Sequence, residues 1–224
     1  RMTFLNPKAC VSVRDMMGEP LLIVDDFYSD PDSVRDNALS CAYSRPEYGN
    51  FPGKTAHVPT EAANVVCKKI TEYAEKYFQK SIGFKIPIDM ESRECYYQSI
   101  DVPWDEVDEA YKIPHVDYRF RKGLVTVPAL IYLNKPEQCV GGTAFYKNVE
   151  TNLFKIRSVQ DFHFVYRNSP DSSWIIHNTV QMKYNRLVMY NGNMMHTAFI
   201  KPNYFGTEIE NCRLTQNIFL HMHF

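Results

Sequence analysis

The sequence predicts a mainly β domain of the α+β class, with helices near its start and strands through most of the rest. The length of 224 residues suits a single domain. Two helix-like segments come first, and strand-like segments follow from residue 84. The 15 Tyr and 14 Phe residues favour strands. We therefore expect one domain over residues 1–224, in which helices in 1–83 support a curled sheet built from 84–224.

The first third of the chain predicts one strand and two helices. Residues 20–26 are an apolar run with a sharply polar end, which is typical of a buried strand. A capping residue and Pro31 predict a helix that ends near Cys41. Residues 44–58 are dense in turn formers and predict a loop. The longer helix over 60–80 has one apolar face: Val66, Ile70, Tyr73 and Tyr77.

The rest of the chain predicts strands separated by turns. Pro128 inside one strand indicates a bulge or an edge position. Residues 152–168 are ambiguous and admit a short helix. The expected strands are 84–90, 93–100, 113–119, 124–133, 142–147, 174–183, 186–190, 196–200 and 212–222.

Charge and cysteine spacing narrow the function classes. The net charge of −1 gives no global basic field, which argues against nucleic-acid and membrane partners. The six cysteines form no Cys-x-x-Cys pair, which argues against a structural zinc site. No apolar run reaches membrane-spanning length, and no leader opens the sequence. We expect a cytoplasmic protein with reduced thiols.

Two histidines and an aspartate form the most informative pattern. In a strand, residues i and i+2 face the same side, so His115 and Asp117 would project together. His196 begins another expected strand after a turn. Two imidazoles and one carboxylate suit a facial Fe(II) site that leaves positions open for a keto acid and oxygen. The triplet alone is a weak signal, because a histidine with a satisfied hydrogen bond is an equal alternative.

A keto acid would also need a cation for its far carboxylate. Arg213 opens the last expected strand, and its planar fork suits a carboxylate. Alternation places Arg213, Thr215 and Asn217 on one face, so Thr215 could line the same pocket. The alternative is a surface arginine paired with a nearby carboxylate.

Taken together, these residues resemble the iron(II)/2-oxoglutarate-dependent dioxygenase superfamily, especially its prolyl-hydroxylase-like branch. The resemblance covers about residues 92–222 and depends on the order and spacing of its motifs. The motifs are Cys95-Tyr96-Tyr97, His115-Val116-Asp117, Ala129-Leu130-Ile131-Tyr132-Leu133-Asn134, Gly141-Gly142-Thr143-Ala144-Phe145-Tyr146, Asn185-Arg186-Leu187-Val188-Met189-Tyr190, His196 and Arg213.

The resemblance implies a double-stranded β-helix, or jelly roll, that uses Fe(II), 2-oxoglutarate and O2 to hydroxylate its substrate. It implies that His115, Asp117 and His196 are the metal ligands. Arg213 would bind the distal carboxylate of 2-oxoglutarate, with a hydrogen bond from Tyr132. Either Tyr96 or Tyr97 would border the cosubstrate, and we favour Tyr97.

Three departures from the family pattern stand out. The helical N-terminal part matches the family only in general layout. The stretch 201–210 must be an insertion, because the gap between His196 and Arg213 is longer than is common. The segment 94–115 is also long and acidic, and it is either a substrate lid or a solvated loop.

The substrate is less constrained by the sequence. Candidate contacts are Tyr118, Arg119, Tyr146 and Trp174. An arginine that faces the cavity would select a carboxylate, so an amino acid or a carboxylate-bearing metabolite is our first expectation. The alternatives are a peptide or protein substrate, a non-catalytic jelly-roll binding module, and a cupin-type metal enzyme without keto acid. The sequence leaves the oligomeric state open.

Overall fold

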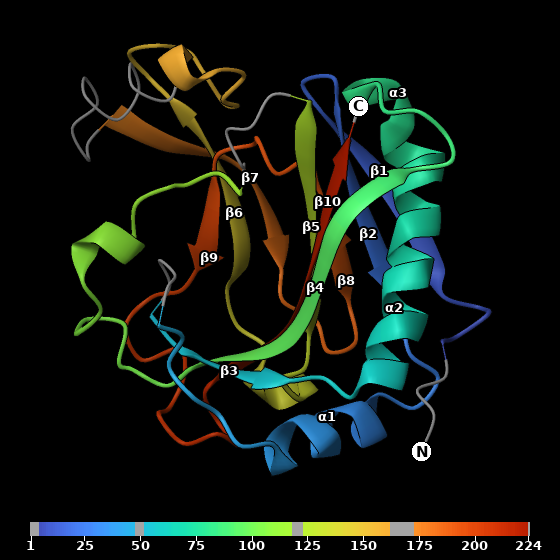
Figure 1. Cartoon of the computed structure of the whole chain (residues 1–224). Coiled ribbons are helices and arrows are strands. Elements are labelled where there is room, and N and C mark those ends of the chain that lie inside the picture. Colours follow the sequence, from blue (N-terminus) through green and yellow to red (C-terminus); the bar gives the residue numbers. More distant parts are fainter. Residues whose placement is uncertain (1–4, 48–51, 118–122, 162–172, 224) are drawn as a thin grey trace.

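The computed structural model describes residues 5–47, 52–117, 123–161 and 173–223. These residues form two antiparallel sheets and few helices, which confirms the mainly β class (Figure 1). The larger sheet has the strand order β1-β2-β8-β5-β10-β4-β3, and the smaller has the order β7-β6-β9. The strands are β1 (Cys10–Met16), β2 (Glu19–Asp25), β3 (Lys54–His57), β4 (Asp89–Ile100), β5 (Leu124–Tyr132), β6 (Gly142–Asn148), β7 (Trp174–Gln181), β8 (Leu187–Met189), β9 (His196–Phe199) and β10 (Arg213–His223).

The helices lie in the first part of the chain, as predicted. Helix α1 (Pro31–Ser40) begins at Asp30, whose side chain accepts a hydrogen bond from the backbone N–H of Ser33. Helix α2 (Thr60–Tyr73) continues through one π-helical turn (Ala74–Phe78) into α3 (Gln79–Ile82). Two short 3-10 turns span Glu109–Tyr111 and Pro136–Gln138. No helix in the described ranges is long and apolar enough to cross a membrane.

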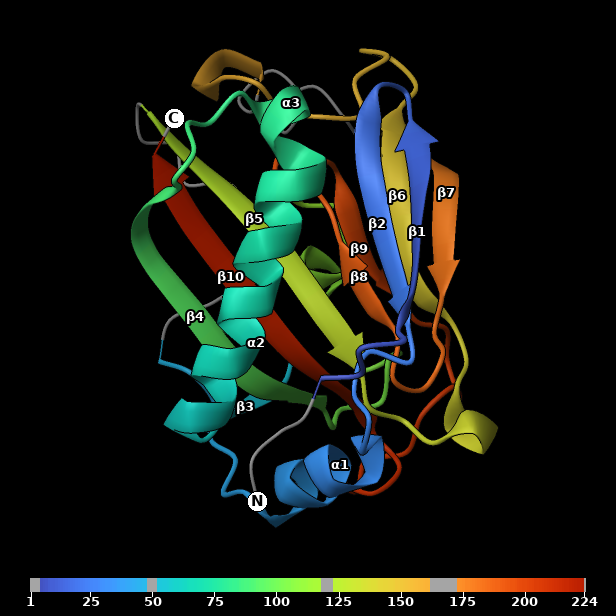
Figure 2. The same cartoon turned by 90° about the vertical axis from the view of Figure 1, so that its right-hand side faces the viewer.

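Alternation along the central strands separates two layers of side chains. Leu214, Ile218 and Leu220 of β10 pack in the buried cluster that also contains Val66 and Ile70 of α2. Figure 2 shows α2 crossing the face formed by β4, β10 and β5. The predicted apolar face of this helix is therefore core packing.

A second buried cluster joins the two sheets. Tyr132 of β5 and Val188 of β8 pack there with Phe145 of β6 and Val180 of β7. Residues alternate along β5 and β8, so one face of these strands packs toward the helices and the other face packs against the smaller sheet. The double-stranded β-helix expected from the resemblance stays a prediction.

Three local predictions need correction. Strands β1 and β3 were not predicted, so the part before residue 84 contributes strands as well as helices. The strand expected from residue 84 begins at Asp89. The strand expected over 113–119 is only an isolated bridge between His115 and His196 within the described residues. The ambiguous segment 152–168, which admits a short helix, lies partly outside the described residues.

Pro128 occupies neither a bulge nor an edge strand. It pairs with Phe219 in the centre of the larger sheet. Its carbonyl accepts a hydrogen bond from the N–H of Tyr190 at 3.3 Å, just past the end of β8. Both backbone groups of a residue in an antiparallel strand point to the same neighbour. The missing N–H of Pro128 therefore faces the place where β8 has already ended.

Candidate metal centre

The three predicted ligands meet at one point. His196 Nε2 lies 3.1 Å from Asp117 Oδ2, and His115 Nε2 lies 3.8 Å from Asp117 Oδ1. One potential ligand atom from each residue lies within 4.8 Å of the others. The structure therefore brings together a His-Asp-His group that could hold a metal ion.

Backbone hydrogen bonds explain this convergence. His115 and His196 exchange two backbone hydrogen bonds of 2.9 Å each. The N–H of Asp117 donates to the carbonyl of Gly192 at 2.7 Å. The segment with the first two ligands is thus held directly against the turn that leads to the third.

The ring of His196 is fixed in a ligating orientation. Its Nδ1 lies 2.8 Å from the carbonyl oxygen of Met194. A carbonyl can only accept, so we assign the proton to Nδ1, which leaves the lone pair of Nε2 directed at Asp117. The ring of Tyr190 packs edge-on against it, with a centroid distance of 4.7 Å.

The surroundings of His115 and Asp117 favour a neutral imidazole and an ionised carboxylate, the forms that a metal ion would need. Desolvation and the neighbouring His196 lower the pKa of His115. Because 47% of its side chain is exposed to the cavity, water moderates the size of this shift but not its direction. Burial alone would raise the pKa of Asp117, but His196 and His115 lower it overall.

The metal group lines a cavity of about 1190 Å³. Arg213 lines the same cavity and is only 5% exposed. Its guanidinium donates to the carbonyl of Gly142 at 3.2 Å, and its Nε has no hydrogen-bond partner among the described residues. No carboxylate within the described parts of the chain forms an ion pair with it. Burial lowers the pKa of Arg213, because the charged guanidinium is poorly solvated there.

Two residues on the same face of β10 as Arg213 also have buried polar atoms without described hydrogen bonds. Thr215 Oγ1 and Asn217 Oδ1 are buried atoms without a hydrogen bond to any described residue. Asn217 lines the cavity, and Thr215 lies between it and Arg213 on the same face of the strand. Three buried polar atoms on one face of β10 thus have no hydrogen-bond partner among the described residues, and two of their side chains line the cavity.

Tyr132 lies behind the cavity wall, beside Arg213. The guanidinium carbon of Arg213 lies 5.7 Å from the centroid of the tyrosine ring. The hydroxyl of Tyr132 is hydrogen-bonded to Thr143 Oγ1 at 2.7 Å, and Thr143 itself lines the cavity. The structure thus places Tyr132 next to the predicted carboxylate anchor.

The preference for Tyr97 over Tyr96 was wrong. Tyr97 packs in the helix-side core and donates from its hydroxyl to Asn37 Oδ1 at 3.0 Å. Tyr96 lines the cavity instead. The two residues are adjacent on β4 and must face opposite sides, so a single step of register separates the two outcomes.

Two predicted substrate contacts lie away from the cavity, and two are not described. Tyr146 and Trp174 pack against the small buried cluster of Ile156 and Met195, and neither is among the described residues that line the cavity. Tyr118 and Arg119 lie outside the described residues, so the prediction of a cavity-facing arginine there stays a prediction.

A family model with the description "family of unknown function (DUF6445)" matches residues 7–220. The chain belongs to the DUF6445 family. No curated protein sequence matches this DUF6445 protein.

Several solved structures are similar to this DUF6445 chain at low identity. HygX from Streptomyces hygroscopicus, with nickel, 2-oxoglutarate and hygromycin B bound, is 13% identical, with coverage of 89% of this chain and 82% of that chain and a TM-score of 0.44. The non-heme alpha ketoglutarate-dependent carbocyclase SnoK is 13% identical (91% and 79% coverage, TM-score 0.48). An N-substituted L-amino acid dioxygenase from Burkholderia ambifaria is 12% identical (90% and 81% coverage, TM-score 0.33).

Some cavity residues of the DUF6445 chain were missed from the sequence. Tyr190 lines the cavity and is buried against His196. Gln98 of β4 also lines it and is hydrogen-bonded to Asn217. Trp104 and Tyr111 line it from the acidic segment after β4. Alternation from Tyr96 would have identified Gln98, but no sequence signal distinguishes Tyr190 from a core tyrosine.

The residues present fit Fe(II) and a keto acid. Two neutral nitrogens and one carboxylate are donors that suit Fe(II) without saturating it. The buried, incompletely bonded guanidinium of Arg213 suits a carboxylate in the same cavity.

Proposed function

We propose that this DUF6445 protein is an Fe(II)/2-oxoglutarate-dependent dioxygenase that hydroxylates a C–H bond of a small molecule. One observation carries the proposal. A buried arginine without a described carboxylate partner lines the same cavity as a converging His-Asp-His group. Either feature alone has a structural explanation, but together they match the two ends of a chelating keto acid.

Physical chemistry explains why Arg213 points to an anionic ligand. A buried charge is costly unless a counter-charge or several hydrogen bonds compensate it. The carbonyl of Gly142 supplies only part of that compensation. A carboxylate would accept two parallel hydrogen bonds from the guanidinium and could also accept one from the hydroxyl of Thr215.

The other residues would orient the cosubstrate and the metal. When bound, Fe(II) would couple the oxidative decarboxylation of 2-oxoglutarate by O2 to hydroxylation of the substrate. His115, Asp117 and His196 would hold one face of the ion. The Met194 carbonyl keeps His196 in the correct tautomer, and Tyr132 packs under the guanidinium that would anchor the cosubstrate.

The cavity supports a second ligand beside the cosubstrate. Its volume of about 1190 Å³ exceeds the roughly 300–1,000 Å³ that commonly hold one drug-sized ligand. Trp104 and Tyr111 provide aromatic surface at its wall. An amino acid or a carboxylate-bearing metabolite is the first substrate class to test, and a peptide is the alternative that a cavity of this size also admits.

Anaerobic spectroscopy tests the cofactors before any substrate is known. We expect addition of Fe(II) and 2-oxoglutarate to the purified protein to produce a weak visible charge-transfer band. Asp117→Ala should abolish the band, because it removes the anionic ligand. Arg213→Gln should weaken 2-oxoglutarate binding about 10- to 100-fold, as expected for loss of charge-assisted hydrogen bonds, while Fe(II) binding is retained.

Product analysis separates the proposal from its rivals. Succinate formation should rise when the correct substrate is added from a panel of amino acids, small acids and peptides. A folded protein that binds neither Fe(II) nor 2-oxoglutarate would instead be a binding module. A protein that binds Fe(II) but never produces succinate would be a metal enzyme of another type.

A further inference from the structure

The carboxamide of Asn134 holds the backbone on both sides of Arg213. Its Nδ2 donates to the carbonyl of Cys212 at 2.8 Å, and its Oδ1 accepts from the N–H of Leu214 at 2.9 Å. Asn134 is fully buried. Both hydrogen bonds are therefore protected from water, and both act on the residues directly beside Arg213.

These bonds matter because the backbone ladder with β5 ends just before Arg213. Its last described backbone hydrogen bond runs from the N–H of Leu133 to the carbonyl of Leu214 at 3.0 Å, next to the pair of Thr215 and Tyr132. On its other side, β10 pairs with β4 from Arg213 itself. The side chain of Asn134 thus continues the ladder with β5 by one more step, at the place where the backbone ladder has stopped.

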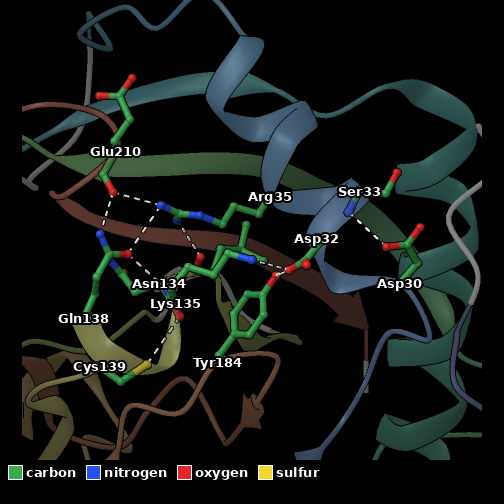
Figure 3. A network of polar contacts seen from close by, with 11 residues as sticks. Asp30, Asp32, Ser33, Arg35, Asn134, Lys135, Gln138, Cys139, Tyr184 and Glu210 are labelled. Carbon is green, nitrogen blue, oxygen red and sulfur yellow. Dashed lines mark hydrogen bonds and ion pairs between the residues drawn. The ribbon is translucent and has the colours of Figure 1, made fainter.

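Arg35 of α1 provides a second layer of support (Figure 3). It is 5% exposed, and its guanidinium donates to the carbonyl of Leu133 at 2.7 Å and to the carbonyl of Glu210 at 2.8 Å. Leu133 immediately precedes Asn134, and Glu210 lies three residues before Arg213. Gln138 Nε2 also donates to the Glu210 carbonyl at 2.8 Å. Helix α1 is therefore connected to the two chain segments that the Asn134 hydrogen bonds join.

We propose that Asn134, supported by Arg35, is a positioning residue that sets the guanidinium of Arg213 toward the carboxylate of the cosubstrate. This inference rests on the proposed function. Neither Asn134 nor Arg35 is among the described residues that line the cavity. Their influence on a ligand must therefore pass through Arg213 and the start of β10.

A matched pair of alanine substitutions tests the inference. Asn148 offers the control, because it is equally buried and its Oδ1 accepts a hydrogen bond from the N–H of Thr151 at 2.9 Å. The dissociation constant of 2-oxoglutarate is measured by anaerobic titration of the Fe(II)-loaded protein, with the charge-transfer band as the signal. We expect Asn134→Ala to raise it about tenfold, equivalent to about 1.4 kcal/mol, and Asn148→Ala to change it less than about twofold.

Two further readouts distinguish positioning from general destabilisation. Fe(II) affinity should be the same in both variants, because neither residue contacts the metal ligands. In turnover assays, Asn134→Ala should raise the KM for 2-oxoglutarate while kcat at saturating 2-oxoglutarate stays near the wild-type value. If Asn134→Ala does not fold, Arg35→Lys takes its place, with an expected increase of about threefold in the same dissociation constant.

The outcomes separate this inference from the proposed function. A wild-type protein that shows no band with Fe(II) and 2-oxoglutarate overturns the proposed function, and this inference with it. A wild-type protein that binds both, with equal 2-oxoglutarate affinities in Asn134→Ala and Asn148→Ala, overturns only the positioning role.

Discussion

His115 illustrates how one residue couples protonation to folding at the candidate metal centre. Its pKa is lowered in the folded protein, first by desolvation and then by the neighbouring His196. Between the lowered pKa and the ordinary histidine pKa of about 6.5, the unfolded chain binds a proton that the folded chain does not. The free energy of unfolding therefore falls as pH decreases through this range. Asp117, whose pKa is also lowered, adds stability that is lost only at more acidic pH.

The metal-free protein should consequently melt at lower temperature as the pH falls from about 7 toward 5. His115→Gln should reduce this dependence, because glutamine does not titrate. Calorimetric melting temperatures of both proteins across this range provide the measurement. Parallel curves for the wild type and the variant would show that His115 does not contribute.

Single residues also show where sequence reasoning succeeds and where it stops. The chemistry and spacing of His115, Asp117, His196 and Arg213 were enough to predict that they come together, and all four line one cavity. Tyr96 and Tyr97 have the same chemistry, so only the register of β4 distinguishes them. That register depends on pairing with β10, a strand more than 110 residues away in the chain, and the sequence near the tyrosines does not contain it.

At the scale of elements, strands with a strong apolar pattern were predicted and strands without one were missed. Strands with an apolar run or an apolar face, such as β5 and β10, were located within one or two residues. Strand β1 is largely exposed and β3 has only four residues, so neither has a strong apolar pattern. Both strands exist because a partner strand pairs with them, and this tertiary pairing overrides weak local propensity.

The backbone of Asp117 lies directly against Gly192, in the turn before β9. A Cβ at Gly192 would lie 2.6 Å from the carbonyl oxygens of both Asp117 and Thr126. Those atoms belong to the backbone, so they cannot rotate away as a flexible side chain would. Gly192 is thus required for the close approach that brings Asp117 to His196.

Gly192→Ala should therefore displace Asp117 and lower Fe(II) affinity about tenfold or more, with a loss of stability of about 1–3 kcal/mol from overpacking. Gly83→Ala is the control: its φ of +83° also disfavours alanine, but a Cβ there meets nothing within 4 Å. The control should lose stability and keep its Fe(II) affinity. Equal Fe(II) affinities in the two variants would contradict the argument.

At the scale of the whole molecule, the candidate site joins the two sheets. His196 belongs to β9 of the smaller sheet, whereas Arg213 belongs to β10 of the larger. A metal ion with a chelating keto acid would therefore contact both sheets at once. Ligands that bind only the folded state stabilise it by mass action. A ligand that contacts both sheets loses part of its site when either sheet unfolds, so it should stabilise the two sheets together.

Bound metal and cosubstrate should accordingly raise the melting temperature of the whole domain in one transition. With Mn(II) as a redox-inactive substitute for Fe(II), and 2-oxoglutarate at about 100 times its dissociation constant, the cosubstrate alone contributes about 2.7 kcal/mol. For a domain of this size that corresponds to about 5–11 °C. Differential scanning calorimetry measures the shift, and Asp117→Ala should show none of it. Two separate transitions, of which only one responds to the ligands, would mean that the ligands bind one sheet and do not connect the two.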